Sequence, residues 1–196
     1  MPLIAFEGLD QSGKETQAGR LQAQLEAAGH RVETLTFPDD RTPIGREIRT
    51  ALAGGHAWLP DVMQLLYVAN RHERKPAIDG WLADGAVVIC DRYLASSVAY
   101  GEAFGLDPVW LMDIQRHLPQ PDLTLLLDIA PQTAVARKQQ GRDRYERDTA
   151  LLARVRESYR RQAGTTAGWV AIDGEGPKDT VAAAVSAAVR SRLALP

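Results

Sequence analysis

A glycine-rich loop near the N-terminus constrains the fold of this chain more than any other feature. The loop follows the short apolar run Leu3–Glu7 and precedes leucines at helical spacing. Its core is a glycine, four residues and Gly13-Lys14. Glycines at these two places let successive N–H groups converge on one anion at a helix N-terminus. The spacing predicts a phosphate-binding loop made of Gly8, Leu9, Asp10, Gln11, Ser12, Gly13, Lys14, Glu15 and Thr16.

The last residues of this loop carry its charges. Lys14 supplies a point charge that can follow the β- and γ-phosphates of a nucleotide such as ATP. A glycine-rich turn with a surface lysine is the alternative, but a strand before the loop and a helix after it favour phosphate binding. Glu15 stands where a hydroxyl residue commonly ligates Mg²⁺, and Thr16 follows it. Because a carboxylate also binds Mg²⁺, directly or through water, Glu15 is a candidate metal ligand.

Short apolar runs alternate with helical patterns along the chain. Besides Leu3–Glu7, the runs are Arg31–Phe37, Ala86–Cys90, Leu123–Ile129 and Trp169–Ile172. They lack strict alternation of polar and apolar residues, so we expect strands that are buried on both faces. The pattern predicts a three-layer α/β fold in which helices flank a five-stranded parallel sheet. Because 45 % of the 196 residues are apolar and no linker divides them, we expect one domain spanning 1–196.

Three segments carry signals of helix ends or helix faces. Leu21 and Leu25 are four residues apart, and Gly29 follows where a left-handed cap would end a helix. Asp107-Pro108 places a capping residue before a proline at the first helical position. The arginine-rich stretch 154–161 also contains apolar residues at helical spacing. We expect a helix with a solvated basic face there, and no nucleic-acid site.

The charge balance and the cysteine content limit the partners of this chain. A formal net charge of −2 argues against binding to nucleic acid or to an anionic membrane through bulk charge. The single cysteine, Cys90, excludes an intramolecular disulfide framework and a cysteine-rich zinc site. It is typical of a reducing compartment, so the cytoplasm is the expected location. No apolar run reaches membrane-spanning length, and neither a membrane nor a nucleic acid is expected as a partner.

Charged residues also follow the third apolar run. Asp91 and Arg92 come directly after it, with Ser96, Ser97 and Tyr100 beyond. Because the carboxyl ends of parallel strands face one crevice, these residues are expected near the phosphate loop. Asp91 is a candidate Mg²⁺ ligand acting through water, and Arg92 a bidentate phosphate clamp. An Asp-Arg ion pair that merely ends a strand is the alternative.

An aromatic residue and an arginine share a face of a predicted helix. Tyr67 and Arg71 are four residues apart in a helical pattern. A ring beside a guanidinium offers a nucleobase both a stacking surface and a hydrogen-bond donor. A core aromatic residue with a surface arginine is the alternative, and periodicity alone does not reject it.

Six groups of residues, taken together, resemble the thymidylate kinase family. The resemblance extends from residue 4 to about residue 150, and the groups occur along the chain in the same order as in the family. The groups are Phe6-Glu7-Gly8 with Asp10 and Gly13-Lys14, Phe37-Pro38 with Arg41 and Ile44-Gly45, Tyr67 with Ala69-Asn70-Arg71, Asp91-Arg92-Tyr93 with Ser96 and Ala99-Tyr100, Pro121-Asp122-Leu123, and Arg144-Tyr145-Glu146.

This resemblance implies transfer of the γ-phosphoryl group of ATP to dTMP with Mg²⁺, in a homodimer whose sheet has the order 2-3-1-4-5. It implies that Asp10 holds the deoxyribose 3′-OH, that Arg41 and Arg92 hold the dTMP phosphate, and that Tyr67 stacks on thymine. Arg71 would donate to the thymine carbonyl. The other residues that it places at the dTMP site are Phe37, Pro38, Asn70, Ser96, Ser97 and Tyr100.

The resemblance also implies a short lid at about residues 137–147. Some family members carry an arginine inside the phosphate loop, where this chain has Gln11. The positive charge would then come from the lid, where Arg142 or Arg144 would act on the transferring phosphoryl group. Arg137 would pack against adenine. Of the two catalytic candidates in the lid, we assign the main role to Arg142.

Two other functions remain open at this stage. One is a nucleotide or deoxynucleoside kinase of the same fold with another acceptor, and the other is a non-enzymatic module that uses ATP as a switch. A switch needs no acceptor pocket. A deoxynucleoside kinase needs a carboxylate base to deprotonate a neutral hydroxyl. Arg41 and Arg92 suit an acceptor that already carries a phosphate.

The role of Arg142 is tested by the Arg142→Ala variant. Removing an internal arginine finger is expected to lower turnover by about 10³- to 10⁵-fold. Nucleotide binding should change far less, because the charge acts on the transferring group. Steady-state kinetics with ATP titrations separate the two effects, and an unchanged turnover would refute the assignment.

Overall fold

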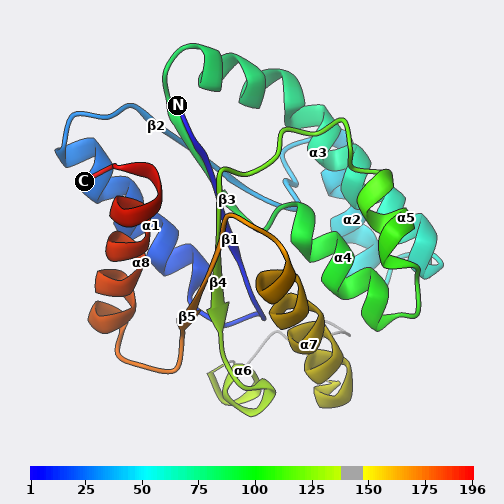
Figure 1. Ribbon diagram of the computed structural model, residues 1–196. Helices are drawn as coiled ribbons and strands as arrows, with labels where there is room; N and C mark the ends of the chain where they lie inside the picture. The colour runs from blue at the N-terminus through cyan, green and yellow to red at the C-terminus, as the bar shows by residue number, and fades with distance from the viewer. Residues whose placement is uncertain (138–147) are drawn as a thin grey trace.

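Five parallel strands form the central sheet of the computed structural model (Figure 1), which describes residues 1–137 and 148–196. The strands are β1 (Leu3–Glu7), β2 (Val32–Thr36), β3 (Val87–Asp91), β4 (Leu123–Asp128) and β5 (Trp169–Asp173). Their order is β2-β3-β1-β4-β5, and all neighbouring pairs are parallel. The expected sheet and its order are therefore confirmed. Each strand end lies within one residue of the end of the apolar run that predicted it.

Helices cover both faces of the sheet. On one face α1 (Lys14–Ala27) and α8 (Lys178–Leu193) pack against Ile4 and Phe6 of β1. On the other face α3 (Pro60–Ala83) lies over β3, while α4 (Leu94–Ala103) and α7 (Thr149–Thr165) lie over β4. The remaining helices are α2 (Pro43–Leu52), α5 (Pro108–Asp113) and α6 (Pro131–Arg137). Figure 1 shows the resulting three layers, as expected from the alternation of strands and helices.

The two edge strands correct the expectation of burial on both faces. The central strands β1, β3 and β4 are buried almost throughout. In β2 only Leu35 is buried, and in β5 only Ile172. The expectation is therefore wrong for Arg31–Phe37 and Trp169–Ile172. The physical reason is that an edge strand has a neighbour on one side only, so the helix layers cover it incompletely.

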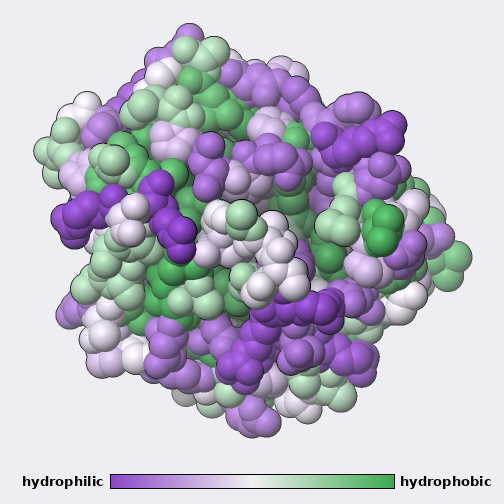
Figure 2. All heavy atoms as spheres, in the orientation of Figure 1, coloured by the Kyte–Doolittle hydropathy of each residue, from purple (hydrophilic) through white to green (hydrophobic). Residues whose placement is uncertain are grey.

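The basic stretch of α7 is a solvated helix face that also forms salt bridges. Figure 2 shows strongly hydrophilic residues over α7 on the face in view. However, Arg156 and Arg160 both form salt bridges with Asp128 at the end of β4, at 2.6 and 2.8 Å. Arg161 pairs with Glu102 of α4. The expected solvated face is confirmed for Arg160 and Arg161, whose side chains are 53 % and 47 % exposed, whereas that of Arg156 is only 25 % exposed. The salt bridges of these arginines also attach α7 to the sheet and to α4.

The predicted helix ends are confirmed where caps were recognised. α1 ends at Ala27, and Gly29 has a left-handed φ of 87° just beyond it. The side chain of Asp107 accepts a hydrogen bond from the N–H of Val109 at 2.9 Å and so caps α5. Over the described residues, none of the helices combines the length and the apolar character that crossing a membrane requires.

Gly8 offers a test of the turn between β1 and the phosphate loop. Gly8→Ala is expected to destabilise the fold, because φ is 138° there and a Cβ would lie 2.5 Å from the carbonyl oxygen of Leu127. Backbone strain alone accounts for about 1 to 3 kcal/mol. Urea unfolding measures the loss.

Gly19→Ala is the matched control. Gly19 lies within α1, and among the described residues a Cβ there meets nothing within 4 Å. This substitution should raise the free energy of unfolding by up to about 1 kcal/mol, because alanine favours a helix interior. A Gly8→Ala chain as stable as the wild type would contradict the described turn.

Candidate active site

The phosphate loop turns between β1 and α1 as its glycine spacing predicts. Gly8 and Gly13 have φ angles of 138° and 94°, and Gln11 also lies in the left-handed region, with a φ of 64°. No side chain of residues 1–137 or 148–196 caps α1, which begins at Lys14. The first N–H groups of α1 are therefore left for an anion, as in other phosphate sites at helix N-termini.

Lys14 lies inside this loop and is only 6 % exposed. Its ammonium group donates to the carbonyl oxygens of Leu9 at 2.8 Å and of Gly8 at 3.2 Å. Burial lowers the pKa of Lys14 to about 8, and the nearby charge of Arg92 adds to this shift. The alternative of a surface lysine on a turn is therefore wrong.

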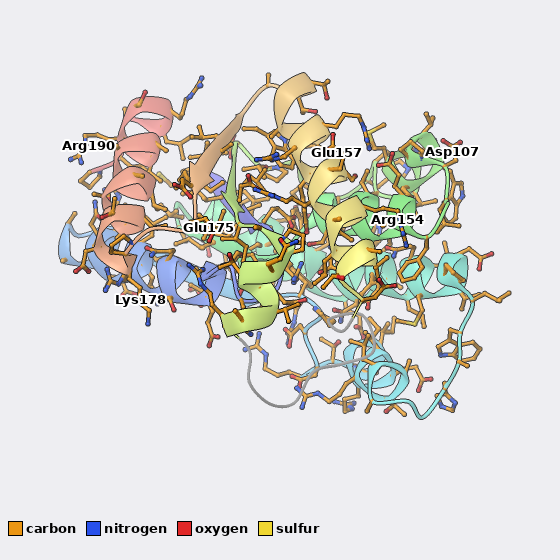
Figure 3. The ribbon with its side chains drawn as sticks, turned by 90° about the horizontal axis from the view of Figure 1, so that it is seen from below. Asp107, Arg154, Glu157, Glu175, Lys178 and Arg190 are labelled. Atoms are coloured by element: carbon orange, nitrogen blue, oxygen red, sulfur yellow. The ribbon has the colours of Figure 1, made fainter. Side chains whose placement is uncertain are left out.

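A polar cavity of about 660 Å³ opens over the loop. Its walls include residues 10–17, Asp91, Arg92, Arg137 and four residues after β5, namely Gly174, Gly176, Pro177 and Lys178. Arg137 donates to the carbonyl oxygens of Gln11 at 3.2 Å and of Gly174 at 3.0 Å. Figure 3 shows Glu175 beside α6 and Lys178 at the start of α8. The size of the polar cavity suits a nucleotide.

Two carboxylates on the walls of the polar cavity suit Mg²⁺. Glu15 belongs to the phosphate loop, and Asp91 ends β3. Oδ1 of Asp91 is buried and has no hydrogen-bond partner among the described residues, which leaves it for a cation or its water. Groups of three or more acidic, His or Cys side chains suited to a metal do not occur in the described residues. Because phosphates and waters usually complete the coordination of Mg²⁺, one or two carboxylates suffice.

A second cavity of about 160 Å³ has mainly apolar walls, and we call it the aromatic cavity. Nine residues expected at the dTMP site line it: Asp10, Phe37, Pro38, Tyr67, Arg71, Arg92, Ser96, Ser97 and Tyr100. Five further lining residues had no motif to mark them: Leu52, Pro60, Met63, Gln64 and Phe104. Asp10, Phe37 and Arg92 line both cavities, so the two cavities meet at these residues.

Arg92 pairs with Asp10 and not with its neighbour Asp91. Its Nη2 donates to Oδ1 of Asp10 at 2.7 Å, and its guanidinium lies 5.3 Å from the ring centroid of Tyr100. Burial by itself raises the pKa of Asp10, but the charges of Arg92 and Lys14 outweigh it and hold this pKa below its usual value. The alternative of an Asp91-Arg92 pair that ends a strand is therefore wrong.

Arg71 is buried and not at the surface, with 2 % of it exposed. It donates to Oγ of Ser97 at 2.8 Å and to the carbonyl oxygen of Tyr93. Its guanidinium lies 5.8 Å from the ring centroid of Phe37, and its Nε has no partner among the described residues. The alternative of a surface arginine beside a core aromatic residue is wrong, because Arg71 and Tyr67 both line the aromatic cavity.

Arg41 and Asn70 do not line either cavity. The Arg41 side chain is 64 % exposed and pairs with Asp39 at 2.8 Å. Asn70 is fully buried, where its Oδ1 accepts from the N–H of Asp39 at 2.8 Å and its Nδ2 donates to Oγ1 of Thr42 at 2.7 Å. Arg74 also pairs with Asp39, at 2.7 Å. These contacts fix the turn after Phe37-Pro38, a network that no sequence motif indicated.

The turn that carries Arg41 is thus held by Asp39. The hydrogen bond from Arg41 and the further bond from Arg74 hold the pKa of Asp39 below its usual value, although burial opposes them. The peptide bond between Phe37 and Pro38 is cis. Asp39 lies between two residues that the family resemblance marks, which is the one sequence signal that pointed to it.

Arg142 and Arg144 lie outside the described residues, as does most of the expected lid. Their catalytic roles stay predictions. Arg137 is described, and its guanidinium contacts backbone carbonyl groups at the wall of the polar cavity. Its expected contact with adenine also stays a prediction.

Comparison with known proteins identifies the family. The profile of the family described as "Thymidylate kinase" matches residues 6–185. The chain belongs to the thymidylate kinase family. Human thymidylate kinase is 36 % identical over 174 residues, which cover 87 % of this chain and 81 % of the human protein. A thymidylate kinase from Thermomicrobium roseum is 36 % identical over 200 residues, covering 95 % and 93 %.

Solved structures and a shorter match agree with this family. A thymidylate kinase structure from Candida albicans superposes with a TM-score of 0.87 and 30 % identity, covering 97 % of this chain and 91 % of the other. The Arabidopsis thaliana thymidylate kinase is 40 % identical over 145 residues. That match covers 74 % of this chain and 55 % of the plant protein, so the chain spans only about half of that relative.

The buried Lys14 predicts that this thymidylate kinase family member takes up protons when it binds ATP. The pKa of Lys14 is about 8 before binding, and a triphosphate beside the ammonium group should raise it. The affinity for ATP should therefore be constant well below pH 8. Above pH 8 it should fall by up to about tenfold per pH unit, because Lys14 must first take up a proton. Calorimetry in buffers of different ionisation enthalpy measures the uptake.

Lys14→Arg serves as the control for this measurement. Its guanidinium does not titrate between about pH 7 and pH 10, so proton uptake in that range should disappear. Equal ATP affinity of the wild type at about pH 7 and about pH 10 would contradict the described environment of Lys14.

Proposed function

We propose that this protein transfers the γ-phosphoryl group of ATP to dTMP and releases dTDP and ADP. Membership of the thymidylate kinase family supports this function. One observation of the structure carries the proposal: the polar cavity and the aromatic cavity meet at Asp10 and Arg92. A phosphate-binding cavity that joins a base-sized one at an arginine suits two nucleotides whose phosphates must approach each other.

ATP would occupy the polar cavity with its phosphates on the loop. The N–H groups at the start of α1 would bind phosphate oxygens, and Lys14 would move from the carbonyl groups of Gly8 and Leu9 towards the β- and γ-phosphates. Glu15 and Asp91 would hold Mg²⁺, Asp91 through water. When bound, Mg²⁺ supplies positive charge that neutralises the phosphates.

dTMP would occupy the aromatic cavity. Tyr67 would stack on thymine, and Arg71, held by Ser97, would donate to a thymine carbonyl group. Arg92 has five N–H donors, so it can bind the dTMP phosphate while it keeps its bond to Asp10. Asp10 would in turn accept from the 3′-OH. Arg41 would reach the phosphate only by turning away from Asp39.

The chemistry needs positioning and charge more than a protein base. The acceptor oxygen of dTMP is already anionic at neutral pH, so no residue has to deprotonate it. Positive charge would be placed around the phosphoryl group during its transfer by four residues: Lys14, Arg92, Arg142 and Arg144. A deoxynucleoside kinase would need a carboxylate base instead. Asp10 is the carboxylate that lines both cavities, and it is a poor base because the charges of Arg92 and Lys14 hold its pKa below the usual value.

The assembly and the location belong to the same proposal. The protein would act as one kinase domain, as a homodimer, in the cytoplasm. Val109 and Met112 of α5 and Leu65 of α3 are exposed apolar side chains of the kind that a dimer interface buries. The single cysteine is free and buried, which accords with a reducing compartment.

ADP release from MgATP tests the acceptor. With dTMP, dUMP, dCMP, AMP and thymidine offered separately, dTMP should give the highest kcat/KM. The 5-methyl group of thymine is worth about 1 to 3 kcal/mol in a pocket, so dUMP should react about 10- to 200-fold less efficiently. Activity with thymidine alone, or with none of the five, would contradict the proposal.

A further inference from the structure

We propose that Glu7 and Tyr159 are positioning residues that set the orientation of the Arg92 guanidinium for the acceptor phosphate. This inference rests on the proposed function. Glu7 ends β1, Tyr159 lies in the middle of α7, and neither lines the polar or the aromatic cavity. Their effect on the reaction would therefore pass through other residues and not through contact with a nucleotide.

Glu7 is a fully buried carboxylate with four donors around it. Its Oε1 accepts from the N–H groups of Tyr93 at 2.8 Å and of Ser96 at 3.3 Å. Its Oε2 accepts from Oγ of Ser96 at 2.6 Å and from the hydroxyl group of Tyr159 at 3.0 Å. A charge buried this deeply is tolerated only with such complete hydrogen bonding.

Glu7 also fixes the start of α4. The helix begins at Leu94, and its N-cap residue Tyr93 makes no capping bond with its own side chain. The carboxylate of Glu7 takes over that role from the neighbouring strand, because it accepts from the N–H groups of Tyr93 and Ser96. Arg92, which immediately precedes Tyr93, has a left-handed φ of 63°. Glu7 thus holds the backbone that carries the guanidinium.

Two hydroxyl groups connect the carboxylate of Glu7 to the guanidinium of Arg92. Nη1 of Arg92 donates to Oγ of Ser96 at 3.2 Å and to the hydroxyl group of Tyr159 at 3.3 Å. A guanidinium only donates, so both hydroxyl groups accept from Arg92. Their own hydrogen atoms are shared between the carboxylate of Glu7 and the 2.8 Å contact between Oγ of Ser96 and the hydroxyl oxygen of Tyr159, in which either group can donate.

The guanidinium is thereby held at both of its ends. Nη2 is bound by Asp10 at 2.7 Å, and Nη1 by the two hydroxyl groups that Glu7 orients. Without the second anchor the group would keep its ion pair with Asp10 and its contact with Tyr100, but Nη1 would no longer be fixed. A bidentate phosphate contact requires a fixed plane, so the loss should weaken binding of the acceptor phosphate specifically.

Tyr159→Phe tests this with little disturbance, because the ring keeps its place in the apolar core. We expect the KM for dTMP to rise about tenfold, which corresponds to one hydrogen bond to a charged group. The KM for ATP and the inhibition constant of thymidine, which lacks the phosphate, should not change. Glu7→Gln is a second variant with the same expected pattern, because its amide group would place donors against both hydroxyl groups.

Ser158→Ala is the matched control, since it removes a buried hydroxyl group of the same helix that donates to Glu102 at 2.7 Å. It should leave the KM for dTMP unchanged. Two outcomes for Tyr159→Phe would overturn the inference: an unchanged KM for dTMP, or a parallel loss of dTMP, thymidine and ATP binding. A wild-type protein inactive with dTMP would contradict the proposed function instead, which keeps the two failures distinct.

Discussion

The ion pair between Arg92 and Asp10 is the contact on which the geometry of the site depends. β1 and β3 are neighbours in the sheet, so the residues after each strand emerge side by side. The N–H of Arg92 donates to the carbonyl oxygen of Phe6 at 2.9 Å, so the hydrogen bonding between the two strands continues up to the residue that lines the cavity. The strand order thereby places a cation from β3 against a carboxylate from the phosphate loop.

Buried cations such as Arg92 equip a chain with a net charge of −2 for the polyanions proposed as its ligands. The binding charge is local: Lys14, Arg71 and Arg92 are each largely buried, and each is held by oxygen atoms of the protein. Buried cations of this kind attract a phosphate more strongly than exposed ones do, because little water screens their charge. The bulk charge of the protein is consequently a poor guide to its ligands.

The features predictable from sequence are those set by local spacing. The loop of Gly8 and Gly13, the five strands and the caps at Gly29 and Asp107 depend on residues close together in the chain. The contacts that were missed join distant residues: Tyr159 reaches Glu7 across 152 positions, and Arg74 reaches Asp39 across 35. Tyr159 occupies an apolar helical position, so its hydroxyl group gave no signal. The family resemblance marked Arg41 and Asn70 for the site but could not show that Asp39 binds both.

α7 illustrates how one helix face joins several parts of the site. Arg156, Tyr159 and Arg160 are three and four residues apart, so they lie on one side of the helix. The two arginines bind Asp128 at the end of β4, while the tyrosine binds Glu7 at the end of β1. β1 and β4 are adjacent strands, and one helix turn spans both of their ends. A small rotation of α7 would therefore strain both attachments at once. This makes the position of the Tyr159 hydroxyl group, and with it that of Arg92, a property of the whole helix layer.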